Sequence, residues 1–385
     1  MEFDLSWLLL SLPVAFALGW LASRLDFRQL RIENRQAPKS YFKGLNFLLN
    51  EQQDQAIDAF IEAVQIDPDT SELHFALGNL FRRRGEYERA VRVHEHLLSR
   101  GDLSKADQGR AQHALALDFL KAGLLDRAEE ALRKLEGTAF ETRSRLALLS
   151  IYERSRDWLQ ASAIAGKLQA ADQGNFSARQ AHYLCEQALA LIVGTPSASD
   201  ASQARQLLEQ AMATAPDAAR PRLALAALMR QQNDHHGAFK TLLALADAAP
   251  AAMGLVAAPL LDAAQATQQQ AQALKVLQNT YAHLPSLDVL DALVALDPQP
   301  DKAHAAYLKH LAHEPSLVAA VAWINHEPAL RAQLQAPVVR ALESALKPLR
   351  RYRCAACGFE ANQHFWQCPG CQAWDSYPPR RIEEL

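Results

Sequence analysis

Four cysteines near the end of the chain are the residues whose spacing points most directly to chemistry. Cys354 and Cys357 form one C-x2-C pair, and Cys368 and Cys371 form a second pair after a spacer of ten residues. Two thiolates on one tight turn can bind a metal ion, and a second such turn completes a tetrahedral site. The pattern therefore predicts one Fe or Zn ion bound by four sulfurs, since both metals accept this donor set.

The residues around these cysteines suit a small metal domain over residues 350–385. Gly358 and Gly370 are expected to adopt turn conformations that a side chain resists, and Pro369 should stiffen the second turn. A segment of about 30 residues cannot build an adequate core alone, so metal binding should supply most of its folding free energy. Its aromatic residues are expected to pack inside it or to dock it against the last helices: Phe359, Phe365, Trp366 and Trp374.

The alternative use of these cysteines is a pair of disulfides. A secreted disulfide framework distributes its cysteines along the chain, whereas all but one of the cysteines here are confined to the segment from Cys354 to Cys371. The remaining one, Cys185, stands alone in a helical stretch and is predicted to be a buried apolar residue. The distribution favours a metal site in a reducing compartment.

No set of residues suggests catalysis. His94 and His96 lack the i, i+4 spacing that places two imidazoles on one helical face. The sequence has no GxxxxGK[ST], GxGxxG, GxSxG or HExxH motif. Forty basic and 43 acidic residues give a net charge of -3, so no attraction of the whole chain to nucleic acid follows. We therefore predict no catalytic residues, a protein that is not an enzyme, and no nucleic-acid partner.

The composition favours packed helices over strands. The chain has 385 residues, of which 49% are hydrophobic but only 7% are aromatic. Alanine and leucine supply much of the remaining hydrophobic content, and both residues favour helices. The expected fold class is all-α, with two or three domains or one long repeat array.

The N-terminal residues 1–23 are predicted to form a transmembrane anchor. Residues 5–22 carry no charge, and as a helix they would span about 27 Å, close to the thickness of a bilayer core. Trp7 and Trp20 lie near the two ends, as interfacial aromatic residues do. The basic residues of the linker 24–36 follow the segment, so the positive-inside rule places the rest of the chain in the cytoplasm. A cleaved signal peptide or a core helix is the rival interpretation, but no basic residue precedes the apolar run.

Residues 37–349 show an internal repeat. Gly44, Phe47 and Ala56 recur at one constant interval as Gly78, Phe81 and Ala90, within paired amphipathic helices. The pattern resembles the tetratricopeptide repeat, strongly over 37–168 and moderately over 200–285. It predicts a superhelix of helix pairs, which two blocks joined near residue 195 would fit equally well.

The tetratricopeptide resemblance also implies a concave groove that holds a protein segment. Positions that face the groove in this family correspond mainly to basic residues here, so an acidic or carboxylate-bearing partner is expected. A merely solvated face is the competing interpretation. The groove residues implied by the resemblance are Arg82, Arg83, Arg110, His113, Lys121, Arg143 and Arg154.

The chain resembles the lipopolysaccharide assembly protein B (LapB) family over its whole length. The resemblance lies in the order of anchor, repeats and the terminal motif RYRCxxCGF…FWxCPxCxAW. The two C-x2-C turns, or knuckles, also resemble those of rubredoxin. The resemblance implies an adaptor of the bacterial cell inner membrane, single-pass, with its body on the cytoplasmic side. Its implied partners are an FtsH-type AAA+ membrane protease, an LpxC-type lipid A deacetylase that the protease degrades, and an inner-membrane regulator of PbgA type.

Two other functions remain open on the sequence. A membrane-tethered electron carrier would use a redox iron in the four-cysteine site, although the spacer is much shorter than in a true rubredoxin. A general protein-assembly scaffold would use the same repeats for other clients.

Overall fold

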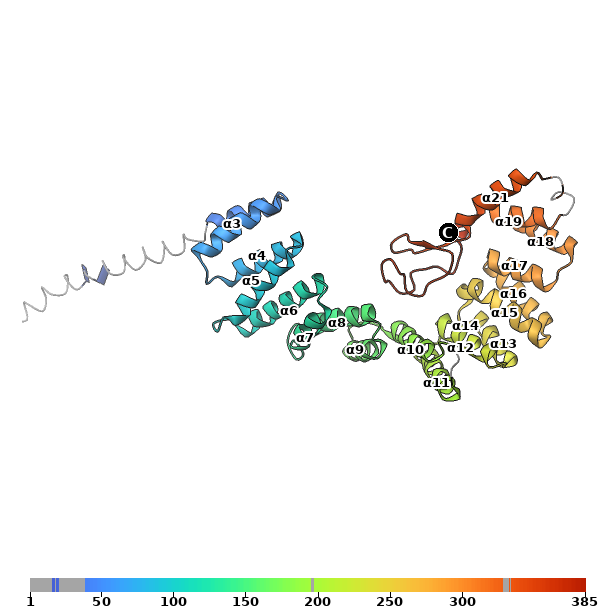
Figure 1. The fold of residues 1–385 in the computed structure, drawn as a ribbon, viewed down its shortest axis with the longest axis horizontal. Coiled ribbons are helices and arrows are strands. Elements are labelled where there is room, and N and C mark those ends of the chain that lie inside the picture. Colours follow the sequence, from blue (N-terminus) through green and yellow to red (C-terminus); the bar gives the residue numbers. More distant parts are fainter. Residues whose placement is uncertain (1–15, 18, 21–38, 195–196, 328–331, 333) are drawn as a thin grey trace, which may run out of the picture. The chain divides into compact units, whose positions relative to one another are not determined.

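The structure is a computed structural model that describes residues 16–17, 19–20, 39–194, 197–327, 332 and 334–385. Helices make up most of the described chain, which confirms the all-α fold class (Figure 1). The chain divides into two compact units, Met1–Ile151 and Tyr152–Leu385. Each unit is built from successive antiparallel helix pairs.

Unit 1 contains the clearest repeats. From α2 to α7 its helices pack in sequence order, each against the next, as a chain of helix pairs joined by short turns requires. They are α2 (Lys39–Leu49), α3 (Gln53–Ile66), α4 (Ser71–Arg84), α5 (Tyr87–Ser99), α6 (Lys105–Lys121), α7 (Leu125–Arg133) and the first part of α8 (Glu141–Ser155).

The repeated glycines let a ring of the second helix approach the first. A Cβ at Gly44 would lie 2.9 Å from the ring of Phe60, and a Cβ at Gly78 would lie 2.5 Å from the ring of His94. Both distances are too short for real contacts, so only glycine allows these rings to lie there. Phe60 and His94 are separated by the same interval as the two glycines. The spacing of small residues therefore confirms the predicted tetratricopeptide-like packing.

Unit 2 continues the helix pairs and ends in the segment that carries the cysteines. Two short strands and one 3-10 turn follow the last helix. The elements are α9 (Trp158–Ala170), α10 (Ser177–Leu191), α11 (Ala198–Thr214), α12 (Ala219–Gln231), α13 (His235–Leu243), α14 (Leu245–Ala248), η1 (Pro250–Ala252), α15 (Met253–Thr267), α16 (Gln270–His283), α17 (Leu287–Leu296), α18 (Pro300–Leu311), α19 (Leu317–Asn325), α21 (Ala336–Leu349), β1 (Tyr352–Arg353), β2 (Glu360–Ala361) and η2 (Ile382–Glu384).

Residue 195, near which the sequence allows a join of two repeat blocks, lies inside unit 2. Helices α10 and α11 flank that position and share one core, in which Leu184 and Ala188 pack with Ala204 and Leu208. The two helices therefore pack against each other on either side of this position. The division instead falls within α8, between Ile151 and Tyr152.

The predicted anchor 1–23 and linker 24–36 lie outside the described residues, apart from Phe16, Ala17, Gly19 and Trp20. Within the described chain no individual helix has the length and apolarity needed to cross a membrane. The segments His235–Ala248 and Pro250–Thr267 meet that test only as a pair, with a bend of 120° between them.

Candidate metal centre

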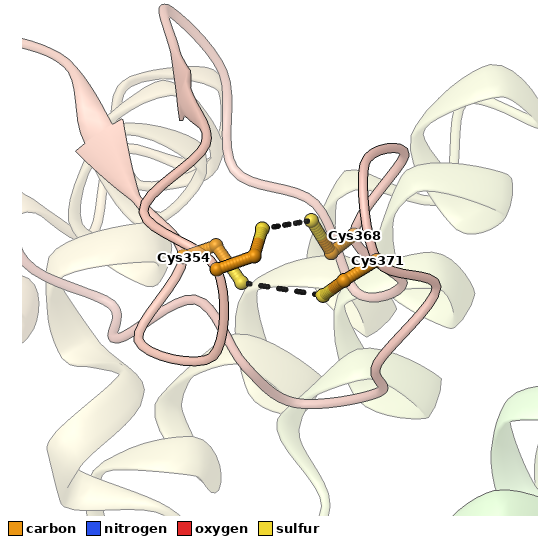
Figure 2. A group of neighbouring side chains, drawn as sticks. Cys354, Cys368 and Cys371 are labelled. Atoms are coloured by element: carbon orange, nitrogen blue, oxygen red, sulfur yellow. Dashed lines mark hydrogen bonds between the residues drawn. The ribbon is translucent and has the colours of Figure 1, made fainter. Parts of the chain in front are cut away.

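The four predicted cysteines meet at one point. All four Sγ atoms lie within 4.8 Å of one another. The Sγ atoms of Cys354 and Cys371 are 3.8 Å apart, and those of Cys357 and Cys368 are 3.7 Å apart (Figure 2). A metal–sulfur bond of about 2.3 Å in a tetrahedral site requires sulfurs about 3.8 Å apart, whereas a disulfide requires about 2.05 Å. The arrangement fits a four-thiolate metal site and no disulfide.

Two turns of the same design hold the sulfurs. In the first, the N–H of Gly358 donates to the carbonyl of Cys354 at 2.9 Å, and in the second the N–H of Gln372 donates to the carbonyl of Cys368 at 2.8 Å. Gly358 has the expected left-handed backbone, with φ of +77°. The expectation for Gly370 was wrong, because the left-handed residue of the second turn is Gln372, with φ of 62°. Gly370 instead lies beside Phe359.

The first turn favours thiolate at Cys354, the form that binds metals. Burial alone would raise the pKa of Cys354, but the hydroxyl of Ser376 and the N–H groups of Cys357 and Ala356 outweigh it and lower the pKa to about 6. The Sγ of Cys354 lies 3.3 Å from Oγ of Ser376. Cys354 and Cys368 are buried, whereas Cys357 and Cys371 are exposed. The site therefore has a buried side, formed by Cys354 and Cys368, and a solvent-exposed outer edge, formed by Cys357 and Cys371.

Trp374 docks this metal domain onto the repeats of unit 2. Its ring stacks on His182 of α10 with a centroid distance of 4.7 Å, and its edge contacts Trp158 of α9. The indole Nε1 donates to Oε1 of Glu153 at 3.0 Å, and the hydroxyl of Tyr183 donates to the same oxygen at 2.5 Å. The ring thus fixes one face of the domain against α9 and α10, and its hydrogen bond fixes it to Glu153 at the end of α8.

A charged group beside Trp374 adds a second connection. The buried imidazole of His182 donates from Nε2 to the carboxylate of Asp375 at 2.9 Å. Arg220 of α12 donates to Nδ1 of His182 at 3.3 Å and to Glu186 at 2.5 Å. A buried arginine needs such partners, and here they join α10 and α12 to the metal domain. The aromatic residues were expected to pack inside the domain or to dock on the last helices, but Trp374 meets the middle of the chain.

The last residues of the chain cap two later helices. The carboxylate of Glu383 accepts from the N–H of Leu317 at 2.6 Å at the start of α19, and Glu384 accepts from the N–H of Leu287 at 2.7 Å at the start of α17. Negative charge is favourable at a helix N-terminus. Arg381 also forms two 2.9 Å hydrogen bonds with Asp288. In Figure 1 the C-terminus lies beside α21, which contacts η2.

We predict that Trp374→Ala loosens the domain without emptying the metal site. Loss of the stacked ring should weaken docking by about 2 kcal/mol, less than a fully buried tryptophan contributes, because part of the ring is exposed. Amide hydrogen exchange should rise at the start of α10 and across residues 350–378, while metal content stays unchanged. The matched control is Phe359→Ala, since Phe359 is 44% exposed on the same domain. Equal exchange in both variants would contradict the docking role.

The predicted groove residues fall into two groups. Arg82 is only 18% exposed and donates to Asp118 at 2.8 Å, and Arg110 pairs with Glu72 at 2.5 Å above the ring of Phe75. Their charges are therefore already matched within unit 1. The others stay exposed, except His113, which stacks on Phe140 at 5.5 Å: Arg83, Lys121, Arg143 and Arg154. Arg154 belongs to unit 2 and the rest to unit 1.

A buried polar cluster behind Arg82 escaped the sequence analysis. Asp118 is fully buried and also accepts from Nδ1 of the fully buried His94 at 2.5 Å. The signal available in the sequence was that His94 stands one repeat length after Phe60, at a position where the repeat calls for an apolar ring. A buried histidine there needs a buried acid, and Asp118 supplies it.

The comparisons with known proteins agree with this architecture. Residues 352–378 match the family described as the rubredoxin metal binding domain. Lipopolysaccharide assembly protein B of Escherichia coli strain K12 is 29% identical over 384 residues, covering 97% of this chain and 98% of that protein. The protein of the same name from Haemophilus influenzae is 28% identical over 396 residues, covering 98% of each.

Among solved structures, Naa15/Naa10 bound to HypK-THB has a TM-score of 0.40 and 15% identity, covering 80% of this chain and 45% of that one. The sequence relatives, by contrast, extend from one end of the chain to the other and include the four-cysteine segment. The resemblance predicted from the sequence is therefore confirmed: this chain is similar along nearly its whole length to lipopolysaccharide assembly protein B and carries the rubredoxin metal binding domain at residues 352–378.

Proposed function

We propose that this protein is a non-enzymatic adaptor in lipopolysaccharide assembly, anchored in the bacterial inner membrane with its repeats on the cytoplasmic side. The observation that carries the proposal is the near full-length similarity to lipopolysaccharide assembly protein B. Repeated helix pairs support a binding role, because such arrays offer extended surfaces to protein partners.

In this proposal the adaptor brings an LpxC-type deacetylase to an FtsH-type membrane protease, and an inner-membrane regulator of PbgA type restrains it. The N-terminal span would confine the repeats to the membrane surface. Confinement raises the effective concentration of one partner beside the other without any new contact. The four-cysteine domain would keep the helices of unit 2 in a fixed arrangement, since it contacts α9, α10, α12, α17 and α19.

The cationic face of unit 1 is the proposed surface for an acidic partner segment. Arg83, Lys121 and Arg143 are exposed and form no ion pair within the described chain. Burial lowers the pKa of His113, and the positive charges of Arg143 and Arg82 lower it further. The unpaired charge of Arg143 is therefore close enough to act on His113.

The function is tested by depleting the protein and following the abundance of the deacetylase. We expect the deacetylase to accumulate several-fold on depletion and to return to its normal level when the wild-type chain is restored. The triple variant Arg83→Glu, Lys121→Glu, Arg143→Glu should fail to restore it, because these cations would hold the partner. Arg82 and Arg110 are left unchanged, since their reversal would disturb the ion pairs with Asp118 and Glu72.

The matched control reverses three other exposed cations of the same unit that form no ion pair within the described chain: Lys43→Glu, Arg92→Glu and Lys105→Glu. It changes the charge by the same amount and should restore normal deacetylase levels. An unchanged deacetylase on depletion would defeat the regulatory proposal. Full restoration by the first triple variant would defeat only the cationic surface.

The exposed outer edge of the metal site favours one second candidate, a membrane-tethered electron carrier. Cys357 and Cys371 are exposed, and Phe359 beside them is exposed as well. Metal analysis and absorption spectra of the purified chain separate the two functions. A reversible iron couple needed for activity would favour the carrier, whereas a fully active zinc form would exclude it.

A further inference from the structure

A small cavity lies where the C-terminal strap crosses the starts of two helices of unit 2. Its volume is about 160 Å³, and it is enclosed by the N-terminal ends of α15 and α17 and by the strap residues Pro378–Arg380. Its walls are mainly apolar, including Met253, Leu284 and Val289. A cavity of about this volume can hold a short aliphatic or benzene-sized group.

Two polar groups in this cavity lack partners. Ser286 is 6% exposed, and its Oγ makes no hydrogen bond within the described chain. Arg380 lies at the rim and forms no ion pair with any described residue. An unpaired buried hydroxyl is costly, and a charged acceptor is its strongest partner. A carboxylate would satisfy the hydroxyl and the guanidinium together.

The neighbouring charges leave Arg380 as the uncompensated group. Asp288 is bound by Arg381 through two hydrogen bonds of 2.9 Å. Glu384 is bound by the N–H groups of Leu287 and Arg381. Each nearby carboxylate therefore has donors of its own within the described chain, which leaves the guanidinium of Arg380 available for a carboxylate from outside.

The next helix pair shows what such a serine binds in this fold. Ser316 precedes α19 as Ser286 precedes α17. The hydroxyl of Ser316 donates to the carboxylate of Glu383 at 2.7 Å, and the N–H of Leu317 donates to the same carboxylate. At α17, Glu384 reaches the N–H of Leu287 but not the hydroxyl of Ser286. One serine of the pair has its glutamate and the other does not.

We propose that this cavity is a binding site for a carboxylate on a short aliphatic stem, namely a glutamate side chain of a protein partner. The carboxylate accepts a hydrogen bond from Ser286 and pairs with Arg380, while its methylene groups contact the apolar walls.

The test uses the metal-loaded full chain in lipid nanodiscs and ligand-observed NMR titration. The probes are butyrate, its neutral analogue butyramide, and N-acetyl-glutamate N-methylamide. We expect saturable binding of both carboxylates, with butyramide at least about tenfold weaker, as the loss of a hydrogen bond to a charged group implies. Ser286→Ala and Arg380→Gln should each weaken carboxylate binding about tenfold.

The matched control is Arg340→Gln, which removes a charge from α21 outside the cavity and should leave binding unchanged. Ser286→Ala removes only an unpartnered hydroxyl, so the melting temperature of this variant should not fall, and lost binding cannot be attributed to misfolding.

Two results would overturn the site. These are equal binding of butyrate and butyramide, or full carboxylate binding by Ser286→Ala, and either would mean that the hydroxyl of Ser286 binds only water. Binding of butyrate without the glutamate derivative would overturn the protein partner as the source.

Discussion

Replacing Cys368 by serine will empty the metal site and unfold residues 350–378 while the helices of the repeats remain. A structural four-thiolate site contributes about 10 kcal/mol or more of apparent binding free energy, which is far above what this small core can supply. That core consists of Tyr352, Cys354, Cys368 and Tyr377 with a few partly buried neighbours. Metal analysis should show loss of the ion, and trypsin should cleave rapidly at Arg351 and Arg353.

The matched control is Cys185→Ala, because Cys185 is buried and lies far from the site in sequence. Burial raises the pKa of this thiol to about 12, so it is not expected to bind a metal. The control should keep full metal content and resist trypsin. A Cys368→Ser chain that loses the ion yet resists trypsin would show that the packing of Trp374 on α10 suffices without the metal.

Replacing Asp118 by alanine will destabilise unit 1 by about 3 kcal/mol, the cost expected when one member of a buried charged group is removed. The buried His94 then loses its acceptor, and Arg82 loses its carboxylate. The free energy of unfolding from urea titration should fall, and hydrogen exchange should rise in α4 through α6. The control Asp58→Ala removes an exposed carboxylate of α3 and should change little.

A rescue variant separates packing from charge at this cluster. His94 occupies the place that Phe60 holds one repeat earlier, so Asp118→Leu with His94→Phe gives the cluster an apolar core. Apolar replacement of a buried ion pair is often neutral or stabilising, and Arg82 keeps the carbonyl of Ala114 and Oδ1 of Asn79 as acceptors. The double variant should recover most of the lost stability. If the free energy of unfolding does not recover, the cluster stabilises unit 1 through the hydrogen bonds that it makes to α6.

The metal ligands and the repeats could be predicted from the sequence because both depend on regular residue spacing, within one turn for the cysteines and within one helix pair for the repeats. Cys354 and Cys357 meet on one turn whatever the rest of the chain does, and the same holds for Cys368 and Cys371. Gly44 and Gly78 indicate where two helices must touch, since a side chain would collide there. The turn residue of the second knuckle was mistaken because a non-glycine residue, Gln372, adopts the left-handed backbone.

The docking of the metal domain could not be predicted in the same way. His182 and Asp375 lie 193 positions apart and meet only because successive helix pairs bring α10 beside the C-terminal segment. The charge of the predicted groove shows the same limit. Arg82 and Arg83 are neighbours in sequence, yet the first is matched by Asp118 from two helices further on, and the second is exposed without such a partner.

The sequence by itself therefore determined the four sulfur ligands, the helical class and the family resemblance, because each rests on contacts within one turn or on a period of one helix pair. Only the tertiary structure decided which cations are free, where the metal domain docks, and that Ser286 has no partner while Ser316 has Glu383. These features depend on the accumulated rotation from one helix pair to the next. Small changes in that rotation move side chains past one another, so no local pattern records them.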